Sequence, residues 1–302
     1  MLVPGLDPQG PVAVEMARLW WLMLGLGGAV FLLYTVLLLR GLWRRSAGRA
    51  SPRSWLVGGG LVMPLVVVSV VLGFTLMAMA RLSNRPTDND LVIEVDGHQF
   101  WWEVRYSDLS VVTANEIHVP VERPILLRVR SVDVIHSFWI PSLAGKIDLL
   151  PDKTNTMSFS ASQVGTYRGV CAEFCGLQHA KMALTAFVTS DEEFVEWSGL
   201  QAEPATEITD EADSRGYEIF LSAGCPDCHT IRGTPADGTT GPDLTHIASR
   251  STLAAGTIPN TTEHLTSWVR DPQEIKEGVE MEAAELSEEN LADLIAYLES
   301  LQ

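Results

Sequence analysis

The stretch CAEFCGLQHAKM, residues 171–182, places two thiols, one imidazole and one thioether within a single short segment. Cys171 and Cys175 are four residues apart, His179 follows four residues later, and Met182 three residues after that. Thiolate and thioether sulfur match a soft, polarisable metal, so this set of donors favours copper over calcium or magnesium. The flanking runs TYRGV and ALTAFV are typical of strands, so the segment is predicted to connect two strands of a sheet.

The donors exceed what one copper ion needs. A single-copper electron-transfer site uses one Cys, two His and a weak axial Met. A further imidazole is available at His136 in SVDVIHSFWIPS, where it is expected to follow an alternating strand, yet a second Cys and the carbonyl of Glu173 are left over. The economical solution is a pair of coppers bridged by both thiolates, each capped by one imidazole. The predicted copper ligands are His136, Cys171, the Glu173 carbonyl, Cys175, His179 and Met182.

Two simpler uses of these cysteines stay open at this point. A disulfide between Cys171 and Cys175 suits an oxidising compartment, although it leaves His179 and Met182 at ligand spacing without a role. Zinc is the second alternative, although Met is a poor zinc ligand and structural zinc loops prefer the spacing CxxC.

The region from Leu91 to about Val188 has the pattern of an all-β domain. Short runs rich in β-branched and aromatic residues are separated by Gly, Pro, Asp and Asn. Runs at this spacing predict a sandwich or a small barrel. They are LVIEV, FWWEVRY, EIHVP, PILLRVRS, NTMSFSA, TYRGV and ALTAFV.

A second cofactor motif, GCPDCHT, lies in the C-terminal third of the chain. Cys225, Cys228 and His229 form the CxxCH pattern, in which two thioether bonds anchor a c-type haem and the His binds its iron. A thioredoxin-like redox pair is the competing use of CxxC, but no βαβ pattern surrounds the motif. The four cysteines of the chain are then divided equally between two cofactors.

The sixth iron ligand is expected in the loop before the last helix. That helix is predicted from SEENLADLIAYLESL, with Ser287 as its N-cap, and another helix is predicted from SRGYEIFLSAG. Met281 is the only methionine after the copper segment, so it is the predicted ligand. His246 and His264 are the alternatives.

Two long apolar segments near the N-terminus are predicted to span a membrane. Residues 19–39 are 21 positions without a charge, and residues 54–80 are 27. At ~1.5 Å per residue each segment can cross a hydrocarbon core of ~30 Å, so helices are expected over about 18–40 and 54–81. The connection RGLWRRSAGRASPRS holds five arginines and no acid, which predicts that it stays in the cytoplasm while both termini lie outside.

The chain is strongly acidic outside these apolar segments. It carries 21 basic and 38 acidic residues, a formal net charge of −17, although its mean hydropathy is positive. From residue 211 onward, 17 acidic and 5 basic side chains give a net charge of −12. This charge predicts a basic docking face on the electron donor and no nucleic-acid partner.

The motif C-x-E-x-C-x-x-x-H-x-x-M, with D-V-x-H-S-F and GHQFWWEVRY upstream, resembles subunit II of haem-copper cytochrome c oxidases over roughly residues 10–190. The resemblance implies a binuclear copper A centre in a cupredoxin fold behind two transmembrane helices. It also implies that the Glu173 side chain reaches a magnesium ion at the boundary with subunit I, which Asp133 and Asp148 line. The family often has Trp at the start of the aromatic run, as the point where electrons arrive from a soluble cytochrome c. The electron path expected here is Phe100, Trp101 and Trp102.

The C-terminal part, about residues 211–302, resembles class I cytochrome c. The resemblance implies a contact between its first and last helices, a hydrogen bond from His229 to the carbonyl of Pro242, and a contact of Trp268 with a haem propionate. The residues expected in these roles are Gly216, Phe220, Pro242, Trp268, Leu294 and Tyr297. The whole chain is similar to the fused subunit II of caa-type oxidases, in which a tethered haem removes the need for a Trp platform.

The expected architecture is therefore a multidomain membrane protein. Residues 1–88 hold the N-terminal segment and a two-helix transmembrane hairpin, and residues 89–198 form an all-β cupredoxin sandwich with copper A. Residues 211–302 form an all-α cytochrome c domain. The polar, acidic stretch GLQAEPATEITDEADS predicts a flexible linker, placed at residues 199–210.

These features predict the electron-transfer subunit of a cytochrome c oxidase, an enzyme whose oxygen-reducing site lies on another subunit. No histidine precedes His98, so neither membrane helix offers an imidazole to a metal within the bilayer. Electrons are expected to pass from an external donor to one covalent haem c, then to copper A, then to the subunit that reduces oxygen to water with proton translocation. The expected partners are oxidase subunits I and III, cytochrome c or another donor complex, and the lipid bilayer.

The expected location is a bacterial inner membrane, crossed twice, with the metal domains and both termini on the periplasmic or extracellular side. Two other functions stay open. The chain could be the electron-input subunit of a copper-A nitric oxide reductase, or a membrane-tethered electron carrier or copper-storage protein without a catalytic partner. A quinol oxidase subunit is disfavoured, because quinol chemistry needs neither metal motif.

Overall fold

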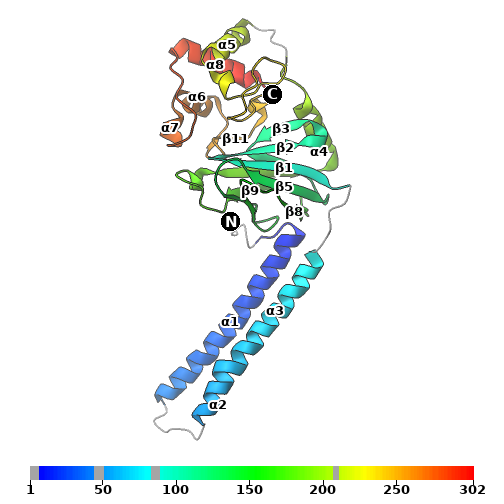
Figure 1. Ribbon diagram of the computed structural model, residues 1–302, viewed down its shortest axis with the longest axis vertical. Helices are drawn as coiled ribbons and strands as arrows, with labels where there is room; N and C mark the ends of the chain where they lie inside the picture. Colours follow the sequence, from blue (N-terminus) through cyan, green and yellow to red (C-terminus); the bar gives the residue numbers. More distant parts are fainter. Residues whose placement is uncertain (1–6, 44–50, 83–88, 207–210) are drawn as a thin grey trace.

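The computed structural model describes residues 7–43, 51–82, 89–206 and 211–302. Two long helices lead to a β-sandwich, and a helical domain covers the end of the sandwich that is remote from them (Figure 1). This architecture confirms the predicted combination of a helical hairpin, a cupredoxin-like sandwich and a cytochrome c domain. Most of the predicted cytoplasmic connection falls on residues 44–50, and part of the predicted linker on residues 207–210, outside the described residues.

Both N-terminal helices are long and apolar enough to cross a membrane. The first is α1, Pro11–Trp43, and it begins with the proline at the first helical position, where no N–H is needed. The second runs without a break from Pro52 to Leu82. It consists of α2 (Pro52–Val57), the π-helical turn η2 (Gly58–Val62) and α3 (Met63–Leu82).

The π-helical turn η2 lies where three glycines precede Pro64. A π-helical hydrogen bond joins residues five positions apart, so the carbonyl of Gly59 would pair with residue 64, but Pro64 has no N–H to donate. Tyr34 of α1 donates its hydroxyl to the carbonyl of Gly59 at 3.1 Å. The neighbouring helix thus satisfies a backbone group that would otherwise face lipid unpaired.

The start of α1 is attached directly to the sandwich. The N–H of Gln9 donates to the carbonyl of Ser142 at 2.6 Å, and the carbonyl of Gln9 accepts from the N–H of Ser162 at 2.7 Å. Glu15 of α1 pairs with Arg81 of α3 at 3.3 Å, which joins the two helices at the same end. The sandwich therefore begins at the surface of the membrane that the helices would span.

The sandwich consists of two five-stranded sheets, ordered β3-β2-β1-β5-β8 and β4-β10-β9-β6-β7. All seven runs predicted to be strands form strands, and three short strands were not predicted, namely β3, β6 and β7. The strands are β1 Leu91–His98, β2 Trp101–Tyr106, β3 Val111–Ala114, β4 Glu116–Pro120, β5 Ile125–Ser131, β6 His136–Trp139, β7 Ile147–Leu149, β8 Asn155–Phe159, β9 Gly165–Cys171 and β10 Ala183–Thr189.

Alternation along β2 separates its two tryptophans. Trp102, Val104 and Tyr106 point into the core between the sheets and have no exposed surface. Trp101, one residue away, points to the other face of its sheet because side chains alternate along a strand. The two tryptophans of the predicted electron path therefore lie on opposite faces.

Two sequence-based expectations differ from the structure. His136 begins β6 instead of following a strand, since residues 132–135 form an irregular connection after β5. Residues 199–202, assigned to a flexible linker, belong to helix α4, Asp191–Ala202. Helix α4 begins with a capping box between Ser190 and Glu193, and Trp197 packs on Tyr106 of the sandwich with ring centroids 5.3 Å apart. Tertiary packing therefore stabilises a helix whose apolar stripe is weak in the sequence.

The C-terminal domain is helical, with one short hairpin. Its first and last helices, α5 and α8, pack together through Gly216, where an added Cβ would lie 2.5 Å from Cβ of Tyr297. Ser287 caps α8 by accepting from the N–H of Asn290 at 3.2 Å, as predicted. The elements are α5 Glu211–Ser222, η5 Cys225–Asp227, η6 Ile247–Ser249, β11 Thr252–Leu253, β12 Ile258–Pro259, α6 Thr262–Arg270, α7 Pro272–Ile275 and α8 Glu288–Ser300.

Replacing Gly216 with alanine is expected to loosen the contact between α5 and α8. The new methyl group would overlap the backbone carbonyl of Asp293 and Cβ of Tyr297, so the C-terminal domain should lose about 1–3 kcal/mol of unfolding free energy. Gly199→Ala in α4 is the matched control, because no atom lies within 4 Å of its added Cβ and helix propensity should improve. Guanidinium unfolding, followed by haem absorbance, measures both. Equal midpoints in the two variants would contradict the close approach at Gly216.

Candidate copper and haem sites

The loop between β9 and β10 folds back so that its sulfur atoms meet. Cys171 donates its N–H to the carbonyl of Met182 at 2.9 Å, which closes the base of the loop. The Sγ atoms of Cys171 and Cys175 lie 3.8 Å apart, and the Cys171 Sγ lies 3.2 Å from the carbonyl oxygen of Glu173. The Cys175 Sγ lies 3.7 Å from Nδ1 of His179 and 3.8 Å from Sδ of Met182. Both thiols are free, so the alternative disulfide is not formed.

His136 reaches the same place from the neighbouring strand. β6 pairs with β9, with Phe138 opposite Cys171, and this register brings the imidazole next to the thiols. His136, Cys171 and Cys175 are all buried, and their ligand atoms lie within 4.8 Å of one another. The two parts of the predicted copper motif, which are 35 positions apart, are therefore together in the fold.

The orientation of the His136 ring is set by Asp133. Its Nε2 atom lies 2.7 Å from a carboxylate oxygen of Asp133, and the ring has no exposed surface. Its Nδ1 atom is buried and has no hydrogen-bond partner within the described part of the chain. A hydrogen bond at one ring nitrogen fixes which nitrogen is available to a metal. The buried, unpartnered Nδ1 beside two thiols therefore fits a metal ligand.

The protonation of the two thiols is strongly asymmetric. Hydrogen bonding with Cys175 holds the pKa of Cys171 far below its ordinary value, although burial opposes this effect. The same contact, together with burial, raises the pKa of Cys175. Burial also opposes ionisation of His136, but the Asp133 carboxylate and Cys171 outweigh it and raise its pKa. One of the two thiols is thus readily ionised, and a bound cation would deprotonate the other thiol as well.

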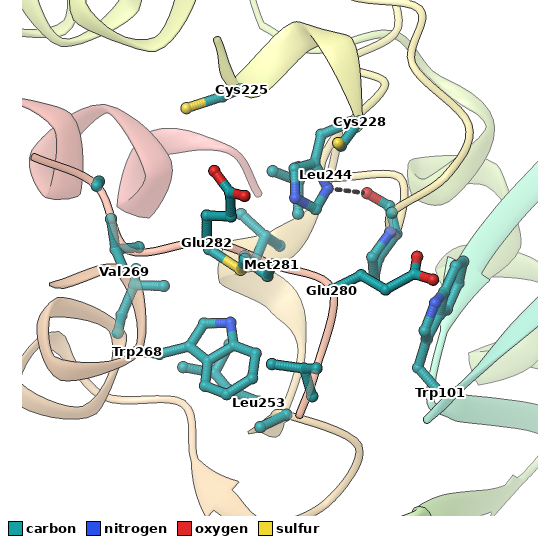
Figure 2. A pocket seen from close by; sticks show the side chains of 18 of the residues that line it. Trp101, Cys225, Cys228, Leu244, Leu253, Trp268, Val269, Glu280, Met281 and Glu282 are labelled. Carbon is teal, nitrogen blue, oxygen red and sulfur yellow. Dashed lines mark hydrogen bonds between the residues drawn. The ribbon is translucent and has the colours of Figure 1, made fainter. Parts of the chain in front are cut away.

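A cavity of about 580 Å³ lies between the helical domain and the sandwich, a volume that suits a cofactor. Figure 2 shows Cys225 and Cys228 on one side of this cavity, Trp268 across from them, and Met281 between. Trp101 of the sandwich lies at its edge. All the predicted haem-attachment residues therefore face one space, including the proposed sixth ligand.

The imidazole of His229 is prepared to bind iron through one nitrogen. Its Nδ1 atom donates to the carbonyl of Pro242 at 2.7 Å, the hydrogen bond expected from the resemblance to cytochrome c. Burial lowers the pKa of His229, which favours the neutral ring, whose second nitrogen, Nε2, then keeps its lone pair. A Cβ on Gly241 would lie 2.6 Å from Cε1 of the ring, so only glycine permits this approach.

The other predicted residues of this domain lie either at the cavity wall or elsewhere in the domain. Phe220 and Tyr297 have ring centroids 6.1 Å apart, and Phe220 and Leu294 line the cavity. The alternative ligand His246 lies near two backbone carbonyls, that of Gln302 at 2.6 Å from Nδ1 and that of Glu203 at 3.0 Å from Nε2. The other alternative, His264, is hydrogen-bonded to Thr261 on α6. Neither of these histidines lines the cavity.

Arg250 is a buried arginine in the cavity wall that was not predicted from the sequence. One of its terminal nitrogens donates to the carbonyl of Asp243, and its Nε atom is buried with no partner among the described residues. Burial lowers its pKa, although a guanidinium remains charged at neutral pH. A buried cationic donor with spare capacity suits a carboxylate of a bound group. The only available signal was its position after the GPDL motif, which does not by itself predict burial.

The predicted electron-path residues divide between the two sites. Phe100 and Trp101 line the haem cavity, while Trp102 packs edge-on against His136 with ring centroids 6.0 Å apart. Gln99 was not assigned a role from the sequence, yet it also lines the cavity and donates its side-chain N–H to the carbonyl of Cys175 at 2.5 Å. The β1–β2 turn therefore forms part of the cavity wall, and it is also hydrogen-bonded to the loop that contains the two thiols.

The acidic residues expected at the subunit boundary are not all together. Lys146 lies 3.0 Å from Asp148 and 3.8 Å from Glu173, so these two carboxylates share one lysine. Asp133 instead faces His136. The Glu173 side chain is about half exposed and lies near Lys146, while the backbone carbonyl of Glu173 faces the Cys171 thiol.

Taken with the two apolar helices, these sites define a class of protein, a membrane-anchored electron-transfer chain with a copper-type sandwich and a c-type haem domain. The family model "Cytochrome C oxidase subunit II, periplasmic domain" matches residues 109–188, and the model "Cytochrome c" matches residues 214–302. The chain belongs to the cytochrome c oxidase subunit II family and carries an added cytochrome c domain. This family implies copper, and the added domain implies haem.

Similarity to known proteins extends over nearly the whole chain. Cytochrome c oxidase subunit 2 of Alkalihalophilus pseudofirmus is 33% identical over 314 residues, covering 98% of this chain and 90% of that relative. The subunit 2 of Bacillus sp. strain PS3 is 31% identical, covering 80% and 71%. The solved periplasmic domain of subunit II from Bradyrhizobium japonicum is 32% identical, with a TM-score of 0.37, and covers 38% of this chain and 95% of that domain.

Removing the carboxylate beside His136 is expected to weaken copper binding. Asp133→Ala frees the imidazole to rotate and lowers its basicity, and loss of such a supporting partner typically costs ~10–100-fold in metal affinity. Asp133→Asn keeps a neutral acceptor and should fall between this variant and the native chain. Asp152→Ala, an exposed acid of the same domain, is the control. Competition with a copper chelator measures the affinities, and equal values for Asp133→Ala and the control would contradict the role of Asp133.

Proposed function

We propose that this chain accepts electrons at a covalently bound haem c and passes them through a binuclear copper A centre to an oxidase subunit that reduces oxygen to water with proton translocation. The observation that carries the proposal is the β1–β2 turn. Gln99 and Phe100 line the haem cavity, and the same Gln99 donates to the carbonyl of Cys175 in the copper loop. The proposed haem site and the proposed copper site thus share the β1–β2 turn as a common wall.

In this proposal the thiolates of Cys171 and Cys175 would hold both copper ions, and Nδ1 of His136 and of His179 would each hold one of them. Met182 and the carbonyl of Glu173 would supply one weak ligand each. Copper supplies reversible one-electron redox chemistry here, while the two strands and the closed loop hold the ligands in place, so the geometry changes little on electron transfer.

The haem would be attached through Cys225 and Cys228, with His229 and Met281 as axial ligands. Met as the second axial ligand favours a higher potential than His would. The unpartnered Nε of Arg250 and the indole of Trp268 would face the propionates. Each of these side chains lines the same cavity.

The apolar helices are proposed to dock on oxidase subunit I, with subunit III completing the complex. Their most hydrophobic windows are 0% and 6% buried within this chain, so nearly all of their apolar surface is free for lipid or other helices. With the arginine-rich connection in the cytoplasm, both metal domains would lie in the periplasm or outside the cell. Glu173 would reach a magnesium ion at the boundary with subunit I if the Lys146 contact opened. The acidic haem domain would then receive a basic donor such as a cytochrome c.

Two variants test the proposed order of the two centres in the assembled oxidase. Cys171→Ser should stop oxygen consumption while the haem c is held reduced by the donor, because the block lies after the haem. Met281→Ala should slow turnover with the donor while a small reductant still reduces the copper centre, because that lesion lies before the copper. Oxygen consumption and steady-state haem absorbance measure both outcomes.

The visible haem spectrum of Cys171→Ser and the mixed-valence copper signal of Met281→Ala serve as internal controls. Each should be intact, since the two sets of ligands belong to separate loops. Near-normal oxygen consumption in a copper-free Cys171→Ser complex would contradict the proposal, because electrons would then bypass the copper loop.

A further inference from the structure

The haem domain contacts the copper loop through a short segment, residues 275–278, the docking segment. The segment begins at the last residue of α7 and ends three positions before Met281. Gln178 donates its side-chain N–H to the carbonyl of Glu277 at 2.7 Å, and Lys181 donates its ammonium to the carbonyl of Ile275 at 2.7 Å. Both donors flank His179 in the copper loop. The segment that precedes Met281, the proposed haem ligand, is thus hydrogen-bonded to the loop that contains the proposed copper ligands.

Lys276 of the docking segment is buried in the contact itself. Only 2% of the residue is exposed, and its ammonium donates to the carbonyl of Phe100 at 2.8 Å and to the carbonyl of Ala254 at 3.0 Å. Burial lowers the pKa of this lysine to about 7. An ammonium removed from water must keep its hydrogen bonds, because an unpaired buried donor is costly. The contact with Phe100 therefore permits few relative placements of the two domains.

Further contacts hold the haem domain at other points around the cavity. Glu116 of the sandwich accepts from both the N–H and the hydroxyl of Ser251, at 2.7 and 2.6 Å. Ala183, the first residue of β10, donates its N–H to the carbonyl of Ala255 at 3.0 Å. Arg232 donates to the carbonyl of Ser110 at 3.3 Å. The haem domain is thus attached on several sides and not only through the chain that precedes it.

The docked arrangement brings the two proposed metal sites to a common wall. Lys276 fixes the Phe100 carbonyl, and the adjacent Gln99 donates to the Cys175 carbonyl. Both Phe100 and Gln99 line the cavity that would hold the haem. If the domain moved away, this connection from the haem to the copper loop would be broken.

We propose that Lys276 and Gln178 are positioning residues that hold the haem domain docked on the copper loop, so that electrons cross at Gln99 and Phe100 without movement of the domain. This inference rests on the proposed function. Each transfer moves one electron from the haem iron to the copper pair, and no bond or proton is transferred. The docking segment keeps the two domains in register.

The test uses the complete oxidase with the variants Lys276→Met and Gln178→Met, which have similar side-chain length but no donor. Lys153→Met and Gln163→Met are the matched controls, because both side chains are exposed and lie on the sandwich. Flash reduction of haem c, followed by the loss of the oxidised copper signal, gives the intramolecular rate as a function of solvent viscosity. Hydrogen exchange of residues 275–278 in the oxidised complex gives a readout that needs no turnover.

The native complex and the controls should show a rate that does not depend on viscosity. In the two variants the electron-transfer rate should fall by roughly tenfold or more. The reason is that losing a buried charged or polar partner lowers the equilibrium constant for docking of the haem domain by more than about tenfold. The rate should also become viscosity-dependent, and exchange of the docking segment should rise. Lys276→Arg, which retains the charge and donors, should recover part of the rate. Unchanged midpoint potentials of both centres would show that the ligands themselves are intact.

Three results would overturn the proposal. Native-like rates in both variants, with no viscosity dependence, would show that the docking segment does not position the domain. A slower rate that is explained by shifted haem or copper potentials, without faster hydrogen exchange of the docking segment, would show that the two residues act on the redox potentials and not on docking. A viscosity-dependent rate in the native complex would mean that the domain moves in each cycle. Failure of the native haem c to reduce copper at all would instead contradict the proposed function. If Lys276→Met does not assemble, Gln178→Met decides the question alone.

Discussion

A buried ammonium needs its hydrogen bonds, and that requirement at Lys276 determines how the haem domain meets the copper domain. Its two acceptors come from different domains, Phe100 in the sandwich and Ala254 in the haem domain. Only when the domains are docked are both carbonyls within reach. The haem cavity is complete only in that state, because Gln99, Phe100 and Trp101 form part of its wall.

The copper loop is stiff for related reasons. It is closed at its base by the hydrogen bond from Cys171 to Met182 and is held on the outside by the Gln99 side chain. His136 enters from β6, and Asp133 orients its ring. Packing and hydrogen bonds of the sandwich therefore place the donors before any metal binds. Preorganisation of this kind reduces the structural change that accompanies a change in oxidation state.

The candidate ligands could be proposed from the sequence, whereas the contacts between the domains could not. Cys171 to Met182 and Cys225 to His229 are local patterns, so their spacing alone predicts candidate ligands. Gln178 and Glu277 are 99 positions apart, and Lys276 and Phe100 are 176 apart, so one sequence gives no sign that they touch. In the sequence KEGVEM, nothing distinguishes Lys276 from a solvent-exposed lysine. Helix α4 was missed although Ser190 and Glu193 match a capping box, because the acidic composition suggested a linker.

The most direct measurement is the order in which the two centres are reduced when the oxygen-free complex is mixed rapidly with its electron donor. If the docked haem domain is the only inlet, haem c should be reduced first, at a rate proportional to donor concentration. The copper signal should then disappear at a rate that does not depend on donor concentration. Reduction of copper before haem c, at a rate that rises with donor concentration, would contradict this path.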